Sequence, residues 1–186
     1  MIDEKRPPVV EQSVVPLGGD YYMVKHVTKS MCEIIWNFID DNQRAELFAL
    51  YGKDEATAKE GLWREICESG HHAAFYDGLT LVCAMWAEWT EIKGVGRRRV
   101  LGCFCNTEYA KRMTRKFVKF TPICRDAFEL TEPSDVDELF VFIDEKFDSS
   151  RRWAVKAAGF VKAFDAHFNG YPFVCYSRKI GGCDGL

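Results

Sequence analysis

The sequence predicts an α/β domain built on a mixed β-sheet. Three observations lead to this prediction: an unbroken apolar run at residues 139–143, helical patterns between the strand candidates, and two dipeptides that are typical of hairpins. These dipeptides, Asp77-Gly78 and Asn169-Gly170, each separate two apolar-rich runs. They suit a type I′ turn, because both of its central residues need positive φ. Hairpins together with helical connections indicate a sheet that contains both antiparallel and parallel pairs.

Composition supports a folded domain. The chain has 186 residues, of which 47% are hydrophobic and 14% aromatic, so it can bury a substantial core. The net charge of −3 gives no general attraction to nucleic acid or to an anionic membrane. No apolar run approaches the roughly 20 residues that a membrane span needs, and the first residues do not resemble a signal peptide. We therefore expect no membrane partner and no secretion.

The predicted organisation is an extended N-terminal arm at residues 1–20, one domain at residues 21–179 and a flexible tail at residues 180–186. The arm contains several prolines and glycines and shows no clear periodicity. It is either a frayed terminus or a segment that docks on a neighbouring subunit. The sequence leaves both interpretations open.

The first half of the domain is expected to contain one strand, three helices and an antiparallel meander. The expected strand is residues 21–27, the helices are residues 28–39, 44–51 and 54–68, and the meander is residues 71–76, 79–90 and 98–104. Ala58, Leu62 and Ile66 illustrate the helical pattern, because apolar residues four apart lie on one face of a helix. Gly52 and Gly70 end the second and third helices.

A long helix is expected from Thr107 to about Phe128, with a break or kink at Pro122. Its basic residues are Lys111, Arg112, Arg115, Lys116 and Lys119, and three of them lie four residues apart on one face. This face is either a solvated outer surface or a surface that holds phosphate, from a cofactor tail or from nucleic acid. The helix is expected to cross over to the strand at residues 139–143.

The last third of the chain predicts a strand, a short helix and a hairpin. Asp148, Ser149 and Ser150 offer oxygens that can cap a helix over residues 151–158. Gly159 follows where a left-handed residue ends a helix. The final hairpin joins the apolar-rich runs on either side of Asn169-Gly170.

Eight cysteines occur in the chain, and two of them form a Cys-x-Cys pair at Cys103 and Cys105. In a strand these two side chains share one face, which suits either two metal ligands or two buried, inert thiols. A second cysteine or histidine pair at the spacing of a zinc finger is missing. We therefore expect reduced thiols and no metal site.

Four local motifs follow one another along the chain. They are Asp40-Asp41-Asn42-Gln43-Arg44-Ala45-Glu46-Leu47, the turn Asp77-Gly78, the basic Arg115-Lys116-Phe117, and Arg152-Trp153 before Gly159-Phe160. With the order of strands and helices, they resemble the Gcn5-related N-acetyltransferase (GNAT) fold, in which the last helix ends at Gly-Phe. They are most similar to the acetyltransferase-like proteins encoded among virion genes of short-tailed bacteriophages. The resemblance spans about residues 21–179.

The resemblance implies a site for acetyl-CoA at the start of the long helix. In active members of the family, free backbone amides of a glycine-containing loop bind the pyrophosphate there, favoured by the partial positive charge of a helix N-terminus. The corresponding residues 103–110 contain no glycine, and Glu108 adds a negative charge. The implied candidates for cofactor binding are Asn106, Thr107, Lys111, Arg112 and Arg115.

The resemblance also implies catalytic positions. Many active members use a tyrosine, four residues before the helix-ending glycine, to protonate the leaving thiolate, and here that position is Val155. Glu88 and Glu91 are the candidates for a general base, with a solvated edge or a salt bridge as the alternative role. The family's usual catalytic groups are thus incomplete.

Three functions follow as hypotheses. The first is a virion-associated phage protein with a structural or assembly role and a degenerate acetyl-CoA site, which implies other phage structural proteins or its own copies as partners. The second is an active acetyl-CoA-dependent N-acetyltransferase. The third is weak contact with nucleic acid through the basic helix face. The first implies a location in the virion or the host cytoplasm.

Overall fold

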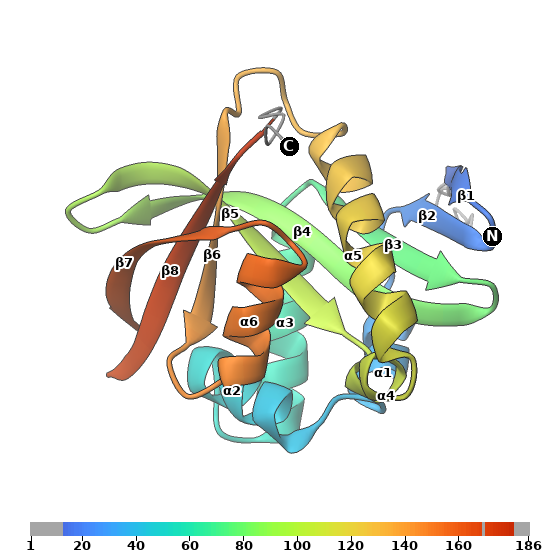
Figure 1. Ribbon diagram of the computed structural model, residues 1–186. Helices are drawn as coiled ribbons and strands as arrows, with labels where there is room; N and C mark the ends of the chain where they lie inside the picture. Colours follow the sequence, from blue (N-terminus) through green and yellow to red (C-terminus); the bar gives the residue numbers. More distant parts are fainter. Residues whose placement is uncertain (1–12, 169, 181–186) are drawn as a thin grey trace, which may run out of the picture.

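The computed structural model describes residues 13–168 and 170–180, which form one eight-stranded sheet with helices packed against it (Figure 1). The strands are β1 (Val14–Gly18), β2 (Tyr21–Lys25), β3 (His72–Asp77), β4 (Thr80–Ile92), β5 (Gly96–Cys105), β6 (Glu138–Asp144), β7 (Val161–Phe168) and β8 (Tyr171–Lys179). The helices are α1 (Lys29–Trp36), α2 (Asp41–Tyr51), α3 (Glu55–Glu68), α4 (Thr107–Arg112), α5 (Thr114–Glu129) and α6 (Asp148–Lys156). The predicted mixed α/β architecture is confirmed.

The strand order across the sheet is β1-β2-β3-β4-β5-β6-β8-β7. Strands β1 to β5 each pair antiparallel with the next, β3 to β5 forming the expected meander, and β8 pairs antiparallel with both β6 and β7. Both expected hairpins form. Between β3 and β4 the loop is Gly78-Leu79 instead of Asp77-Gly78, because Asp77 is the last residue of β3 and pairs with Thr80; Gly78 has φ of 55°, but Asp77 does not have the positive φ that the predicted type I′ turn needs. Gly170 has φ of 82° between β7 and β8. These positive angles are the reason that glycine occupies both turns.

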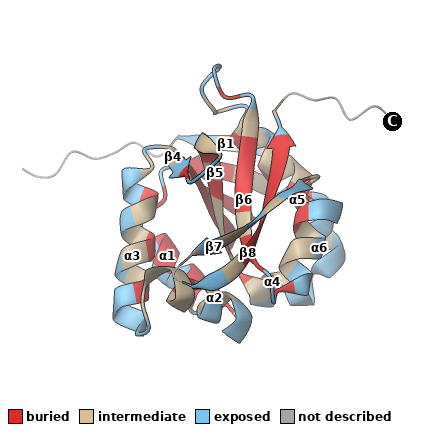
Figure 2. Ribbon diagram, turned by 90° about the vertical axis from the view of Figure 1, so that its left-hand side faces the viewer, coloured by how far each residue is buried: buried red, intermediate tan, exposed pale blue. Residues whose placement is uncertain are grey.

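Two helical layers enclose the sheet (Figure 2). Helices α1, α2 and α3 cover one face, where Ile35 and Ile66 are completely buried. Helices α5 and α6 cover the other face, where Phe120 and Phe128 are buried. The sheet therefore has two separate cores, and the side of each strand residue decides which core it joins.

Alternation along β4 illustrates this division. Cys83 and Met85 belong to the core beneath α5 and α6, whereas Ala84 and Trp86 belong to the core beneath α1, α2 and α3. Successive side chains of a strand point to opposite faces, so one buried strand contributes to both cores. This strand is accordingly apolar along most of its length.

The parallel strands β5 and β6 pair with each other over a short stretch. Arg99 pairs with Leu139 and Val100 pairs with Phe140, and the pairing of these two strands ends there. Beyond this point the two strands diverge toward their carboxyl ends (Figure 1). The sheet is therefore open between the second half of β5 and the second half of β6.

The long helix that the sequence predicted is broken at Met113 rather than at Pro122. Met113 has φ of −116° and ψ of 36°, and it separates α4 from α5. The hydroxyl of Thr114 donates to the carbonyls of Ala110 and Lys111, at 3.1 and 3.0 Å, and so caps the end of α4. Pro122 lies inside α5, so the prediction of the break position was wrong.

The sheet begins earlier in the chain than expected. Strand β1 lies within the stretch that was predicted as an arm, and it pairs with β2 through Val15 and Met23, among others. Residues 1–12 of that arm and residues 181–186 of the expected tail lie outside the described residues. Among the described residues, no helix is long and apolar enough to cross a membrane.

The helix of the last third also begins earlier than expected. Helix α6 starts at Asp148, and Phe147 is its N-cap residue without a capping side chain. Asp148 therefore lies in the first turn instead of capping it, where a negative charge still interacts favourably with the helix dipole.

Candidate functional site

The carboxyl ends of β5 and β6 define the candidate site. In open α/β sheets, ligands bind outside the carboxyl ends of parallel strands. Here β5 leads directly into α4, and β6 leads after a short turn into α6. The candidate site thus comprises the gap between the diverging strands, the start of α4, the facing sides of α5 and α6, and the α2–α3 side of β4.

The first turn of α4 is bonded within the protein. Asn106 is the N-cap residue, and its Oδ1 accepts the amide of Tyr109 at 2.8 Å. The amide of Glu108 donates to the carbonyl of Phe38 at 3.1 Å, and the hydroxyl of Thr107 donates to the same carbonyl at 3.1 Å. Two amides that a pyrophosphate would need therefore already have partners. Asn106 and Thr107, two of the predicted cofactor ligands, cap α4 and bond it to the segment after α1.

Two predicted phosphate ligands on α4 also have protein partners. Lys111 Nζ lies 2.8 Å from Asp40 Oδ2, and Arg112 Nη1 lies 3.6 Å from Glu108 Oε1. Partial burial raises the pKa of Asp40, but the hydrogen bond and charge of Lys111 together with the backbone amides of Gln43 and Asn42 outweigh it, so the pKa lies below its ordinary value. Both cationic side chains are mostly exposed, and such pairs leave them available to an incoming anion at small cost.

The basic residues of α5 fall into two groups. Lys116 Nζ donates to Asp77 Oδ1 at 2.7 Å, and Tyr109 donates its hydroxyl to the same carboxylate at 2.6 Å. Arg115 and Lys119 are exposed and form no ion pair among the described residues. The break at Met113 separates these residues from Lys111 and Arg112, so the expected basic stripe does not lie on one continuous helix. Nucleic-acid contact through this face stays a prediction.

An aromatic contact joins α5 and α6 beside the gap. The indole Nε1 of Trp153 donates to Thr121 Oγ1 at 3.0 Å, and its ring stacks on Phe117 at 6.3 Å between centroids. Val155, at the position that the resemblance assigns to a general acid, is 46% exposed on α6. A valine side chain carries no proton to donate, so α6 lacks this catalytic group.

A polar network lies on the opposite face of β4, between that strand and helices α2 and α3. Glu65 accepts the hydroxyl of Tyr51 at 2.6 Å and the indole N–H of Trp86 at 2.8 Å. Glu88 is close enough to Glu65 that its pKa is raised, first by burial and then by the charge of Glu65. Burial, followed by Glu65, also raises the pKa of the Tyr51 hydroxyl.

Glu46 extends this network to the carboxyl end of β6. Its Oε1 accepts the backbone amide of Asp144 at 3.2 Å. Burial raises the pKa of Glu46 to about 7. The four residues Glu46, Tyr51, Glu65 and Glu88, called the acidic cluster below, thus reach from the end of β6 to the middle of β4.

The structure brings only one of the two predicted general bases into this cluster. Glu88 belongs to it, whereas Glu91 is exposed near the tip of the β4–β5 hairpin, opposite Arg97. Sequence inspection did not assign a site role to Glu46, Tyr51 or Glu65. Glu46 stands in the Arg-Ala-Glu-Leu motif, so that motif was the one available signal.

The comparisons with known proteins agree with this architecture. No family model matches the chain, and no curated protein matches it either. Among solved structures, an aminoglycoside N(6')-acetyltransferase from Legionella pneumophila is similar with a TM-score of 0.58 at 16% identity, over 87% of this chain and 92% of that chain. RimL, a ribosomal alpha-N-protein acetyltransferase in complex with coenzyme A, is similar with a TM-score of 0.54 at 10% identity, over 90% of this chain and 98% of that chain.

A third similar structure is an acetyltransferase from Salmonella typhimurium that modifies the N-terminal serine of a ribosomal protein. It has a TM-score of 0.56 at 10% identity, over 90% of this chain and 99% of that chain. The chain has the GNAT fold. At these identities the GNAT likeness concerns the fold alone, and the predicted fold class is confirmed.

Proposed function

We propose that this protein is a non-catalytic GNAT-fold protein of the short-tailed phage type, with a structural or assembly role in the virion. In this proposal its acetyl-CoA site is degenerate, no cofactor is needed, and its partners are other phage structural proteins or further copies of itself. Its location is then the virion or the host cytoplasm.

The observation that carries this proposal is the bonded first turn of α4. The amides of Glu108 and Tyr109 are bonded to Phe38 and Asn106, at 3.1 and 2.8 Å. A pyrophosphate that displaced the Asn106 side chain would leave a buried side-chain oxygen without a donor, which costs about 1–3 kcal/mol, whereas the Phe38 carbonyl would keep the hydroxyl of Thr107. Val155 in place of a general acid supports the same conclusion.

The acidic cluster favours a second candidate, an active acetyl-CoA-dependent N-acetyltransferase. Acetyl-CoA would supply the thioester, held by Asn106, Thr107, Lys111, Arg112 and Arg115. A carboxylate near neutral pKa can accept the proton that an acceptor amine loses as its nitrogen attacks a carbonyl. Glu46, with a pKa of about 7, and Glu88 are the groups suited to this role. Their negative charge would also favour a cationic acceptor.

Thermal unfolding with and without millimolar acetyl-CoA separates the two candidates. A ligand at 100 times its dissociation constant adds about 2.7 kcal/mol to the native state. We expect no shift. An upward shift that is lost in Lys111→Glu or Arg115→Glu, and acetyl transfer to an amine that is lost in Glu46→Gln or Glu88→Gln, would support the enzyme and contradict the first proposal.

The structural role has its own measurement. Mass spectrometry of purified phage particles should detect this chain at a fixed copy number, and a particle population without it would overturn the virion assignment. For the acetyl-transfer assay, Glu91→Gln is the matched control for Glu88→Gln, because Glu91 lies on β4 like Glu88 but outside the acidic cluster.

A further inference from the structure

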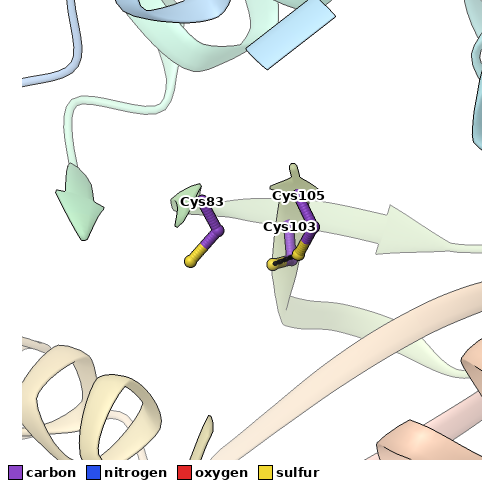
Figure 3. A group of neighbouring side chains, drawn as sticks. All are labelled: Cys83, Cys103 and Cys105. Atoms are coloured by element: carbon purple, nitrogen blue, oxygen red, sulfur yellow. Dashed lines mark hydrogen bonds between the residues drawn. The ribbon is translucent and has the colours of Figure 1, made fainter. Parts of the chain in front are cut away.

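Three cysteines from two neighbouring strands lie close together beneath α5. Cys83 lies on β4, while Cys103 and Cys105 lie on β5, and their Sγ atoms are all within 4.8 Å of one another (Figure 3). The sulfur atoms of Cys103 and Cys105 are 3.3 Å apart. The register explains the convergence, because Cys83 pairs directly with Cys105 across the β4–β5 ladder.

A fourth thiol approaches from the helical layer. Cys124, on α5, is buried and belongs to the same core as Cys83. All four cysteines border one small cavity of about 20 Å³. A cavity of this size holds roughly one water-sized particle. Its other walls are largely apolar and include Phe117, Phe120 and Phe160, and they offer few groups that compete for the thiols.

We propose that Cys83, Cys103, Cys105 and Cys124 form a structural zinc site between the sheet and α5. Thiolate sulfur is the donor that Zn²⁺ prefers in closed structural sites, where four ligands surround the ion as a tetrahedron. With a zinc–sulfur distance of about 2.3 Å, the sulfur atoms of such a site are about 3.8 Å apart. The observed separations, from 3.3 Å to at most 4.8 Å for the three strand cysteines, bracket this value.

The charges around the cavity are compatible with this assignment. Four thiolates and one Zn²⁺ carry a net charge of −2, which is costly to bury without a cation nearby. The side chain of Arg125 borders the same cavity, and its Nη1 donates to the carbonyl of Ala158 at 3.0 Å. This guanidinium also pairs with Asp126 through Nε at 2.7 Å, so it offsets only part of the cost of burying the negative charge.

A structural disulfide explains the arrangement less well. Cys103 and Cys105 are two apart in an extended strand, where Cα atoms lie about 6.8 Å apart, at the upper limit for a disulfide. Cys83 and Cys105 are direct partners in the ladder, where Cα atoms lie about 4.5–5.5 Å apart, so this pair is the one disulfide that the backbone spacing of the three strand cysteines allows readily. A bond between any two of the strand cysteines would also leave the third thiol in the same apolar cavity. Three converging sulfur donors, with the thiol of Cys124 bordering the same cavity, match a metal site more closely than a disulfide.

The test uses the full-length protein with Cys67→Ala as background, because Cys67 is an exposed thiol that could bind zinc by itself. The protein is reduced, stripped of metal without oxygen and titrated with Zn²⁺ alone. We expect one bound zinc per chain by elemental analysis and a rise in melting temperature. Replacement with Co²⁺ should give the sulfur-to-metal charge-transfer and visible absorption of a tetrahedral thiolate site.

Single variants then identify the ligands. Cys83→Ala, Cys103→Ala and Cys105→Ala should each lower the zinc affinity by at least about 100-fold, since loss of a ligand exceeds the 10–100-fold effect of an outer-shell partner. Cys124→Ala should abolish the tetrahedral Co²⁺ spectrum. The matched controls are Cys32→Ala and Cys175→Ala, which remove buried thiols outside the cluster and should bind zinc like the background.

Several outcomes would overturn the zinc site. They are a background protein that binds no zinc, full affinity in Cys103→Ala and Cys105→Ala, or a Co²⁺ spectrum unchanged by Cys124→Ala. A disulfide among these cysteines in protein that was alkylated at isolation would also overturn it. Zinc stoichiometry and the Co²⁺ spectrum of the background protein need no cluster variant, so a variant that fails to fold does not block the test.

Discussion

The indole N–H of Trp153 on α6 donates a hydrogen bond of 3.0 Å to the hydroxyl of Thr121 on α5. The same hydroxyl donates to the carbonyl of Phe117 at 2.9 Å, so Thr121 links both helices through one oxygen. The two helices follow the two diverging strands β5 and β6. This bond therefore fixes the spacing of the helices beside the opening in the sheet.

The first prediction concerns this bond. Trp153→Phe keeps an aromatic ring against Phe117 and removes the donor, and Thr121→Val removes the acceptor. A double-mutant cycle of the two, measured by urea unfolding, should give a coupling energy of about 1 kcal/mol. A coupling energy near zero would mean that the bond does not join the helices energetically.

The second prediction concerns Gly102 on β5. A Cβ at this position would lie 2.2 Å from the indole of Trp86, so the absence of a side chain makes room for that ring. Gly102→Ala should destabilise the fold by about 1–3 kcal/mol through overpacking. In a Trp86→Leu background, which lacks the indole, the cost of Gly102→Ala should be smaller than in the parent protein. If Gly102→Ala unfolds like the parent protein, the contact is not tight.

The third prediction concerns Asp77, at the end of β3. Burial raises its pKa, but hydrogen bonds from Lys116 and Tyr109 lower it by more, so the pKa lies below the ordinary 3.8. Ionised Asp77 therefore stabilises the fold above pH 3.8, and this contribution is lost as the pH falls through the lower pKa of the folded state. Asp77→Asn should cost about 1.5–3 kcal/mol at pH 7, and the difference should shrink in acid.

Asp165→Asn is the matched control for Asp77. Asp165 pairs with Lys162 at 2.8 Å on the surface, where an ion pair contributes less than about 1 kcal/mol. Equal losses in the two variants at pH 7 would contradict the role assigned to Asp77.

The fourth prediction concerns the pH dependence that Glu46 causes. Its pKa rises from 4.5 to about 7 on folding, so the folded state binds the proton more tightly than the unfolded state. The free energy of unfolding should therefore fall as the pH rises from 4.5 to about 7, by on the order of 3 kcal/mol. Glu46→Gln keeps an oxygen for the Asp144 amide and should remove this fall.

Urea unfolding at several pH values from 4 to 8 measures the effect, with Glu46→Ala as the comparison. The alanine variant also loses the acceptor for Asp144, so it should be less stable than Glu46→Gln at every pH. A pH profile of Glu46→Gln that is parallel to that of the parent would show that Glu46 does not titrate in this range.

Local chemistry explains how much of the fold the sequence predicted. Asp77-Gly78 and Asn169-Gly170 predict hairpins, because the geometry of a turn depends mainly on its own residues. Strand β1 was missed because its Pro16 and Gly18 are unfavourable in a strand, and pairing with β2 outweighs them. The helix break at Met113 was missed because it depends on the side chain of Thr114, not on proline.

The site was predicted less completely because it is assembled from distant segments. Glu65 and Glu88 come together through the packing of α3 on β4. Nothing in their local sequence distinguishes them from glutamates on the surface. Cys83 joins Cys103 and Cys105 only through the register of the β4–β5 ladder. The N-cap of α4 was predicted one residue late, at Thr107, whereas Asn106 is the N-cap residue, and the Glu108 amide is bonded to Phe38, which is far away in the chain.

The short pairing between β5 and β6 has a consequence for how the protein unfolds. Among the described residues, Arg99 and Val100 are the ones that pair strands β1 to β5 with the unit of β6, α6, β7 and β8 through the sheet. Much of the remaining linkage is side-chain contact with α5, such as Arg178 Nε to Glu129 Oε1 at 3.0 Å. Backbone pairing across the sheet is thus shortest between β5 and β6, next to the longest pairing, which joins β4 and β5. The unit of β6, α6, β7 and β8 can exchange its amide hydrogens as a separate cooperative block. Its contacts with α5 then set the free energy of its opening.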